Sequence, residues 1–299
     1  MSSASFPFLK LPLVVQLLIL KNLNLFQLLE FSLLSLKCKR IAKSINYPLE
    51  SLKCDFGENI HKLVLQHRGN GVLVLQIRIP ITESSNQLGH LRLDGSVVPM
   101  IRRQWESSGY WLIGDEDSSE ENNLKIIENM CIHIMDVLKV GKCSISLGNV
   151  NKISEMTLFE SQKAFEDLSV NQPISGDDAI FVLEHLDVRN LTLSCQVENG
   201  FEYSAPLKTR HLRLWRNAEW LTADALLKMK CKRIQISSLE NRLTVKDLNN
   251  LIKKWMSGGL ENLEEFVVAM ERNGAEEKLE NIVEGIETTE WDPNQKWYG

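Results

Sequence analysis

The chain has 299 residues, of which 43% are hydrophobic and 24% are charged. These values are typical of a folded protein with one large domain or two of ordinary size. The formal net charge of −5 argues against general nucleic-acid binding, which requires a basic surface. The six cysteines include no Cys-x-x-Cys pair, so we expect reduced thiols in a cytoplasmic or nuclear protein.

The N-terminal stretch predicts three short apolar helices. Leu11-Pro12 opens the first, because proline fits the first turn of a helix, where its missing N–H has no partner to lose. Asn24 can cap the second helix, and either Ser32 or Ser35 leads into the third. Three helices this short expose more apolar side chains than they can bury among themselves. We therefore expect the surplus to contact a partner.

Two other interpretations of this apolar start are a signal peptide and a membrane helix. The uncharged run between Lys10 and Lys21 is only about ten residues long, whereas a span needs roughly 20. No basic start and no small-residue cleavage site accompany the run. A plain helical hairpin belonging to the core is a further alternative.

A β-hairpin is predicted soon after the helices. Asn46-Tyr47-Pro48 ends the helical stretch, because the residue before a proline avoids the helical region. Residues 62–65 and 72–79 then alternate between apolar and polar side chains, and residues 68–71 read Arg-Gly-Asn-Gly. Asn-Gly readily takes the positive φ of tight turns, so this segment predicts two antiparallel strands.

A short apolar unit recurs along the rest of the chain. It has one residue, two variable residues, and then two apolar residues separated by one. Such period-two pairs predict strands with one buried face. The copies begin at Ile60, Leu88, Val188, Thr209, Cys231 and Leu263, and a weaker copy begins at Ile145.

Helical stretches lie between the later copies. Thr222 and Thr244 can cap two of them, and Gly258-Gly259 ends the second. The predicted helices span residues 122–140, 177–186, 222–229 and 244–256. The sequence therefore predicts a mixed α+β (α/β) fold, in which three N-terminal helices precede an irregular, leucine-rich-repeat-like strand–helix domain.

Two further segments carry strong charge. Residues 115–121 form an acidic run, which predicts a solvated, mobile loop, with a docking site for a basic partner as the alternative. Residues 273–299 are a charged C-terminal tail whose end contains Trp291, Trp297 and Tyr298. These aromatic residues either fold back as a cap or remain loose.

Patterns that support catalysis do not occur in the sequence. The six histidines are scattered without metal-ligand spacing. The sequence has no Gly-rich phosphate loop, no dinucleotide-binding fingerprint and no Gly-x-Ser-x-Gly nucleophile elbow. We therefore predict no catalytic residue, no bound metal and no cofactor, and an enzyme of unrecognised type remains a rival hypothesis.

Residues 6–47 contain, in order, Leu11-Pro12, Ile19-Leu20, Leu23-Asn24, Leu28 and Leu34-Ser35. This stretch resembles an F-box, whose Leu-Pro, Ile/Leu-Leu, Leu-Asp, Leu and Val-Cys-Lys-x-Trp elements align without gaps with these positions. Residues 55–272 look like the F-box-associated domain type 2 of nematode-type F-box proteins. That second resemblance is carried by Trp-Arg-Asn-Ala at 215–218, Lys-Cys-Lys-Arg-Ile at 230–234, and Leu-Asn-x-Leu-Ile-Lys-x-Trp at 248–255.

The resemblance implies a non-catalytic subunit of a Skp–cullin–F-box ubiquitin ligase. The N-terminal helices would bind a Skp-family adaptor and through it a cullin, and the larger domain would hold a protein substrate. The positions expected to contact the adaptor are Leu11, Pro12, Ile19, Leu20, Leu23, Leu28 and Leu34. The alternative is an interaction scaffold whose divergent F-box, with Leu13-Val14 where an acidic pair is usual, does not engage a ligase.

Outward-facing strand positions suggest where a substrate would bind. Arg213, Trp215 and Gln235 lie between buried strand positions, and Trp220 follows closely. Trp and Arg dominate binding energy at protein interfaces, so these four residues are the candidates for substrate contact. The alternative is that Trp215 covers a neighbouring helix as part of the core. We expect neither nucleic acid nor a membrane as a partner.

Overall fold

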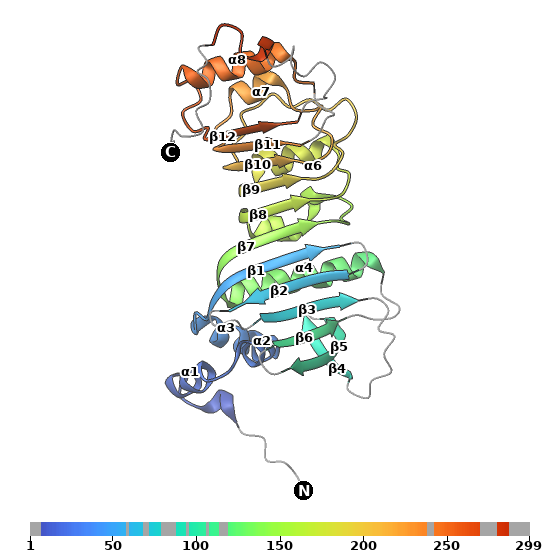
Figure 1. Ribbon diagram of the computed structural model, residues 1–299. Helices are drawn as coiled ribbons and strands as arrows, with labels where there is room; N and C mark the ends of the chain where they lie inside the picture. Colours follow the sequence, from blue (N-terminus) through green and yellow to red (C-terminus); the bar gives the residue numbers. More distant parts are fainter. Residues whose placement is uncertain are drawn as a thin grey trace. The chain divides into compact units, whose positions relative to one another are not determined.

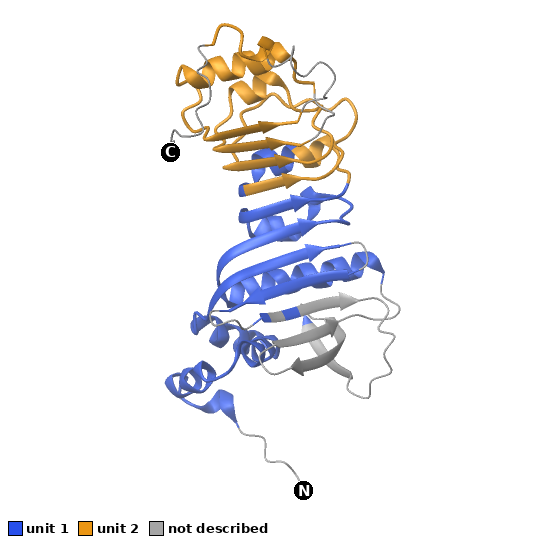
Figure 2. Cartoon of the chain, in the orientation of Figure 1, with its two compact units in different colours: residues 1–172, 180–189 blue, residues 173–179, 190–299 orange. Residues whose placement is uncertain are grey.

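The computed structural model describes residues 7–57, 60–67, 72–78, 88–93, 96–105, 108–113, 119–237, 242–269 and 280–286. The fold is mixed α/β, with three N-terminal helices followed by a strand-rich domain with further helices (Figure 1). The predicted fold class is therefore confirmed. The chain divides into two compact units (Figure 2): Met1–Gln172 with Ile180–Arg189, and Pro173–Ala179 with Asn190–Gly299.

Unit 1 contains the N-terminal helices and most of the strands. Its helices are η1 (Phe8–Lys10), α1 (Leu13–Lys21), α2 (Leu25–Leu33), α3 (Leu36–Ser44), α4 (Glu120–Val137), η2 (Ile153–Glu155), α5 (Thr157–Ser161) and η3 (Phe181–His185). Its strands are β1 (Pro48–Phe56), β2 (Ile60–Gln66), β3 (Val72–Arg78), β4 (Leu88–Leu93), β5 (Ser96–Trp105), β6 (Ser108–Ile113), β7 (Lys139–Leu147) and β8 (Ala164–Val170).

Local capping explains where the three N-terminal helices begin. Pro12 stands at the N-cap of α1. The Asn24 side chain accepts from the backbone N–H of Gln27, and the Gln27 side chain accepts from that of Asn24, which forms a capping box for α2. The Ser35 Oγ accepts from the backbone N–H of Cys38 and caps α3. The predicted helices are confirmed, with Ser35 rather than Ser32 as the third cap.

The sheet of unit 1 has the strand order β8-β7-β1-β2-β3-β6-β5-β4. β1 lies inside it, antiparallel to β2 and parallel to β7. The sequence pattern does not predict β1, because Ser51 and Leu52 are both buried and interrupt the alternation that marks a strand. β5, β6 and β8 also lie outside the sequence predictions.

The predicted hairpin is formed by β2 and β3. The two strands are antiparallel, and Leu63 pairs with Leu75 while Val64 pairs with Val74. The turn expected at residues 68–71 lies outside the described residues. Beyond the hairpin, β6 is parallel to β3, and β5 is antiparallel to both β6 and β4.

The long helix α4 packs on the sheet of unit 1 beside β1 and β2 (Figure 1). It begins at Ser119, whose Oγ accepts from the backbone N–H of Asn122. Glu120 and Glu121 occupy its first turn, where the helix dipole stabilises negatively charged side chains. The expected loop over residues 115–121 is therefore wrong for Glu120 and Glu121, which are helical. Residues 115–118 lie outside the described residues.

Unit 2 contains four parallel strands in the order β9-β10-β11-β12. Leu191, Leu212, Ile234 and Phe266 stand in one register row across them. The elements from here on are α6 (Gly176–Ile180), β9 (Asp187–Leu193), β10 (His211–Leu214), α7 (Ala223–Leu227), β11 (Arg233–Ile236), α8 (Val245–Met256) and β12 (Glu265–Val268). The recurring apolar unit therefore forms strands, as predicted.

Side-chain caps begin the two helices that connect these strands. Thr222 Oγ1 accepts from the backbone N–H of Ala225 at the start of α7. Thr244 and Asp247 form a reciprocal capping box at the start of α8. Both helices begin where the sequence predicts. The predicted domain limits, 6–47 for an F-box, 55–272 for an associated domain and 273–299 for a tail, stay predictions.

Candidate functional site

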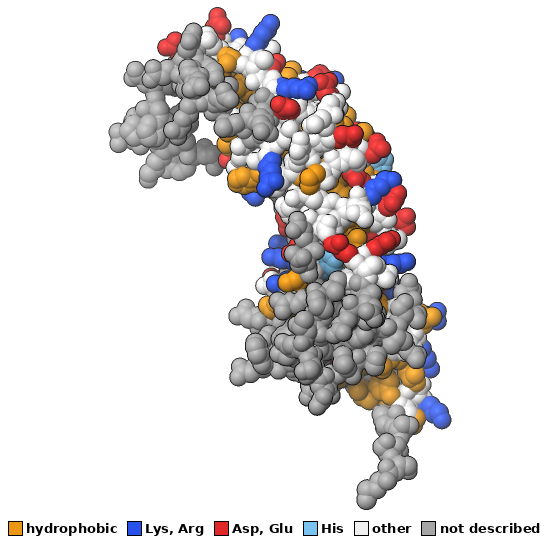
Figure 3. Space-filling model, turned by 90° about the vertical axis from the view of Figure 1, so that its right-hand side faces the viewer, with side chains coloured by type: hydrophobic (Ala, Val, Ile, Leu, Met, Phe, Trp, Pro, Cys, Tyr) orange, Lys and Arg blue, Asp and Glu red, His pale blue; other side chains and the backbone are white. Residues whose placement is uncertain are grey.

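The N-terminal helices carry a set of exposed hydrophobic side chains. Helix α1 is apolar on nearly all sides, so only part of its surface can be buried. Val14 is 68% exposed and Leu36 is 75% exposed. Figure 3 shows hydrophobic side chains gathered at the lower end of the view, where these helices lie. We call this set the N-terminal apolar surface, and it consists of Leu9, Leu13, Val14, Val15, Leu18, Ile19, Leu34 and Leu36.

The junction of α2 and α3 borders a hollow in unit 1. The hollow has a volume of about 720 Å³, and Leu34 and Leu36 line it together with Ile132 and Asn129 of α4. Apolar side chains at the rim of a concave surface are typical of sites that receive a partner. The N-terminal apolar surface therefore continues toward α4.

The seven positions predicted to contact an adaptor occupy different environments. Pro12, Ile19 and Leu34 are exposed, and Leu11 and Leu23 are half-buried. Leu20 and Leu28 are buried in the core, so they hold the helices together and cannot contact a partner without unfolding. The role of the other five stays a prediction.

Six residues of the N-terminal apolar surface were missed by the pattern. They are Leu9, Leu13, Val14, Val15, Leu18 and Leu36. For the four that lie on α1, the signal that could have identified them is the lack of any charged residue between Lys10 and Lys21, because such a helix must leave some apolar side chains outside the core.

Polar contacts connect α2 and α3 to α4. Ser32 Oγ and His133 Nε2 are 2.8 Å apart and share a hydrogen bond. Lys39 and Lys43 form ion pairs with Asp136 at 2.8 and 2.5 Å. These contacts join the N-terminal helices to the sheet domain of unit 1.

The same contacts shift two ionisation equilibria. Burial, with the nearby charge of Lys39, lowers the pKa of His133 to about 4. Hydrogen bonds from Lys39 and Lys43 lower the pKa of Asp136. At neutral pH the ring is therefore uncharged and the carboxylate is charged, as this packing requires.

In unit 2, the strands present a second exposed surface. Arg213 is exposed, Trp215 is 50% exposed, and Gln235 is half-buried. Trp220 differs, because it is only 2% exposed and its Nε1 donates to the carbonyl oxygen of Asn217. The structure thus brings Arg213, Trp215 and Gln235 to one strand surface. It places Trp220 in the core, so the prediction that Trp220 belongs with these surface residues is corrected.

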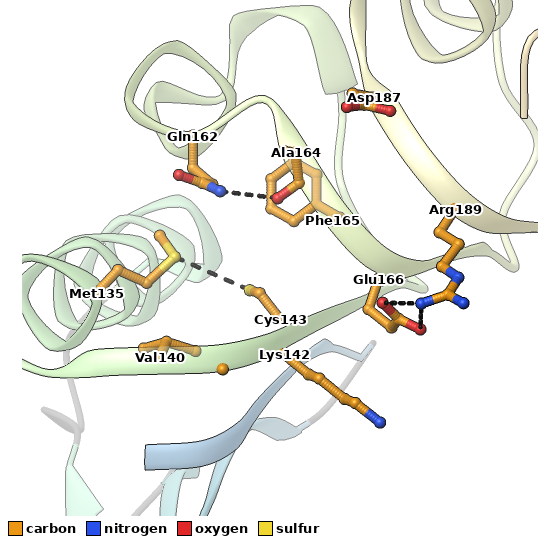
Figure 4. Close-up of a pocket in the computed structure, with 11 residues that line it drawn as sticks. Met135, Val140, Lys142, Cys143, Gln162, Ala164, Phe165, Glu166, Asp187 and Arg189 are labelled. Atoms are coloured by element: carbon orange, nitrogen blue, oxygen red, sulfur yellow. Dashed lines mark hydrogen bonds and ion pairs between the residues drawn. The ribbon is translucent and has the colours of Figure 1, made fainter. Parts of the chain in front are cut away.

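A pocket of about 440 Å³ opens in unit 1 beside β7 and β8 (Figure 4). Met135 Sδ lies 3.9 Å from Cys143 Sγ in its wall. Glu166 and Arg189 form an ion pair at 3.1 Å, so their charges neutralise each other. Among the described residues, no nucleophile paired with a general base lines this pocket.

All six cysteines are free and buried. The Sγ atoms of Cys54 and Cys131 are 2.8 Å apart, and burial raises the pKa of both thiols. Burial also raises the pKa of Cys195 and of Cys231 to about 11. Protonated, buried thiols are poor nucleophiles, so these cysteines contribute to packing.

Metal ions and membranes each require a particular arrangement of side chains. In the part of the chain that the structure describes, no group of three or more His, Cys, Asp or Glu residues is arranged to hold a metal ion. Over the same residues, no helix combines the length and the hydrophobicity that crossing a bilayer demands.

A family model described as F-box associated matches residues 205–268. We call these matched residues the F-box-associated segment. It extends through β10, α7, β11, α8 and β12, and it therefore contains Arg213, Trp215 and Gln235. The resemblance to an F-box-associated domain inferred from the sequence is confirmed over residues 205–268, and this segment supplies most of the exposed strand surface of unit 2.

A relative from Caenorhabditis elegans, described as an uncharacterized protein, is 24% identical over an alignment of 324 residues. The alignment covers 98% of this chain and 67% of the relative. It is consistent with a nematode-type protein. No solved structure matches the chain.

Proposed function

We propose that this protein is the substrate-recognition subunit of a Skp–cullin–F-box ubiquitin ligase. In this role the N-terminal apolar surface binds a Skp-family adaptor, and through it a cullin. The F-box-associated segment binds the substrate protein. The observation that carries the proposal is the occurrence, in one chain, of an F-box-associated segment and N-terminal helices whose large hydrophobic side chains remain exposed.

The exposed side chains give the adaptor a physical reason to bind. Val14, Leu18 and Leu36 lie mostly in water, and covering one such side chain contributes about 1.5 to 3 kcal/mol at full burial. The contacts of α2 and α3 with α4 meanwhile keep the helices in place. An adaptor would therefore meet a preformed apolar surface, which lowers the entropy cost of binding.

No catalytic side chain is needed for this function. Holding a substrate beside a ubiquitin-charged enzyme raises the local concentration of its lysines, and proximity alone accelerates the transfer. The irregular, leucine-rich-repeat-like order of strands and helices would offer the outward strand surface to the substrate. Such a protein would act in the cytoplasm, the nucleus or both.

Co-purification with a Skp-family adaptor tests the proposal. We expect the full chain to capture the adaptor, and the double variant Val14→Glu/Leu18→Glu to lose capture, because two carboxylates cannot be buried in an apolar interface without a large desolvation cost. Met256→Glu is the matched control, since Met256 is an equally exposed hydrophobic residue of unit 2 and should leave capture unchanged.

Capture by the double variant at the wild-type level would contradict the proposal. Both altered residues are exposed, so the variant should unfold at nearly the wild-type temperature. That measurement separates loss of an interface from loss of the fold.

A second candidate is a protein-interaction scaffold that does not join a ligase. The exposed pair Leu13-Val14, which stands where an acidic pair is usual in an F-box, favours it. On this hypothesis the wild-type chain itself fails to capture the adaptor. The same experiment therefore separates the two functions.

A further inference from the structure

The outward side of the unit 2 strands carries two register rows of side chains. Parallel pairing aligns the first row, and backbone hydrogen bonds one residue beyond each strand extend the ladder to the second. Alternate residues of a strand point to the same side, so both rows share one surface. The first row is Thr192, Arg213, Gln235 and Val267, and the second is Ser194, Trp215, Ser237 and Ala269.

Among the described residues, the positive charge of this surface is not paired. Arg213 is the charged residue among these eight positions, and within the described residues it makes no ion pair. Arg233 occupies the preceding row of the same side, but it lies 3.6 Å from Glu265 and 3.8 Å from Glu264. Because carboxylates neutralise Arg233, Arg213 is the arginine of the two whose charge is available to a ligand.

Apolar area adjoins this charge. Trp215 lies two residues after Arg213 on the same side of β10, a separation of about 7 Å along an extended strand. Trp215 is 50% exposed, and Val267 is 44% exposed in the row of Arg213. Gln235 lies between Arg213 and Val267 in the first row, and its Nε2 donates to Ser237 Oγ at 3.1 Å. This hydrogen bond holds the Gln235 side chain in one orientation on the surface.

We propose that this surface binds an extended segment of the substrate protein in which an Asp or Glu lies next to an apolar or aromatic residue. The carboxylate pairs with the Arg213 guanidinium, whose planar N–H groups match it in two hydrogen bonds. The adjacent side chain packs on Trp215, a residue type enriched at interface centres. This inference rests on the proposed function, because it names the substrate class that the F-box-associated segment takes.

Charge complementarity selects this occupant over others. Nucleic acid requires many cations along its backbone, whereas one unpaired arginine among these eight positions meets one or two carboxylates. A basic partner would be repelled by Arg213. A purely apolar partner would leave the guanidinium buried without an acceptor, at a large cost in desolvation.

A peptide selection tests the proposal. The full-length protein is immobilised and used to select from a displayed library of random, unphosphorylated 12-residue peptides. We expect the wild type to enrich Asp or Glu beside aromatic or aliphatic residues. Arg213→Glu should enrich Lys and Arg instead, and Trp215→Ala should keep the acidic preference but lose the apolar one.

Arg233→Lys is the matched control, since it alters an arginine on the same side but keeps the positive charge that Glu264 and Glu265 face, and it should select like the wild type. A selected acidic peptide should bind Arg213→Glu at least about tenfold more weakly than wild type, with wild-type binding weakened by salt. Absence of acidic enrichment by the wild type, or the same enrichment by Arg213→Glu, would overturn the inference.

The selection involves no adaptor, so its outcome is separate from that of the co-purification. Normal adaptor capture without acidic enrichment would contradict the proposed substrate class but not the proposed ligase role. Acidic enrichment without adaptor capture would contradict the ligase role but not the proposed binding surface.

Discussion

His133 is a buried histidine at the contact between the N-terminal helices and the sheet domain of unit 1. Its Nε2 bonds Ser32 Oγ, and the charged groups that influence it are Lys39, which lowers its pKa, and Asp136, which raises it. Burial is the largest cause, and the net pKa is about 4. Because the His133 ring is neutral in the folded protein, the stability of the packing of α2 against α4 depends on pH.

The sign of this coupling predicts destabilisation by acid. The unfolded chain protonates His133 near its ordinary value of 6.5 and the folded chain only near 4, so the unfolded state binds more protons between these values. The stability contributed is complete above about pH 6.5 and is lost as the pH falls toward 4. Urea unfolding at about pH 7 and about pH 5 should therefore show a loss of about 2 kcal/mol from this residue.

His133→Gln supplies the comparison, because an amide keeps a hydrogen-bonding group beside Ser32 without titrating. The variant should lose less stability between the two pH values than the wild type, while His61, whose pKa burial also lowers, titrates in both proteins. Equal pH dependence of the two proteins would show that His133 is not the group responsible.

At the scale of elements, capping explains why such short helices form where they do. Each of the three N-terminal α-helices has nine residues, a length at which an isolated helix is unstable in water. A side chain satisfies a free N–H at the start of α2 and of α3, and the helices gain further stability by packing on one another and, through α3, on α4. The caps therefore position the N-terminal apolar surface.

Removal of the α2 cap should weaken the fold measurably. Asn24→Ala deletes the acceptor for the backbone N–H of Gln27 and should lower the free energy of unfolding by about 1 kcal/mol. Asn24→Ser keeps a capping oxygen and should change it by only a few tenths. Chemical denaturation of the three proteins measures both effects, and equal stabilities of the Ala and Ser variants would refute the role of the cap.

At the scale of the whole molecule, the cysteine thiols lie in the packed interior of both units. The six cysteines occur on α3, β1, α4 and β7 in unit 1 and after β9 and before β11 in unit 2. All are buried, and both units therefore protect thiols from solvent.

This distribution predicts slow thiol chemistry in the native protein. An aromatic disulfide reagent added under native conditions should label the cysteines only slowly, and all six should react at once in denaturant. Mass spectrometry of the labelled protein counts the modified sites. Rapid labelling of Cys195 and Cys231 alone would show that unit 2 opens locally, and rapid labelling of every site would contradict the packing described for both units.

Local patterns account for much of the fold and for part of the candidate sites. Caps at Asn24, Ser35, Thr222 and Thr244 mark helix starts because they depend on atoms only three residues away. The apolar units of β9 to β12 mark strands because alternate residues face inward, buried in β9 to β11 and half-buried in β12. Local spacing does not reveal β1, because Ser51 and Leu52 are both buried between β2 and β7, and β7 lies far along the chain.

The sequence by itself determined the mixed α/β class, the three N-terminal helices, the β2–β3 hairpin and the F-box-associated resemblance, because each depends on short-range spacing. Only the tertiary structure decided which hydrophobic side chains stay in water. Trp215 and Trp220 are five residues apart, yet one is exposed and the other buried. Burial depends on what packs against a side chain from distant parts of the chain, and that information is absent from local spacing.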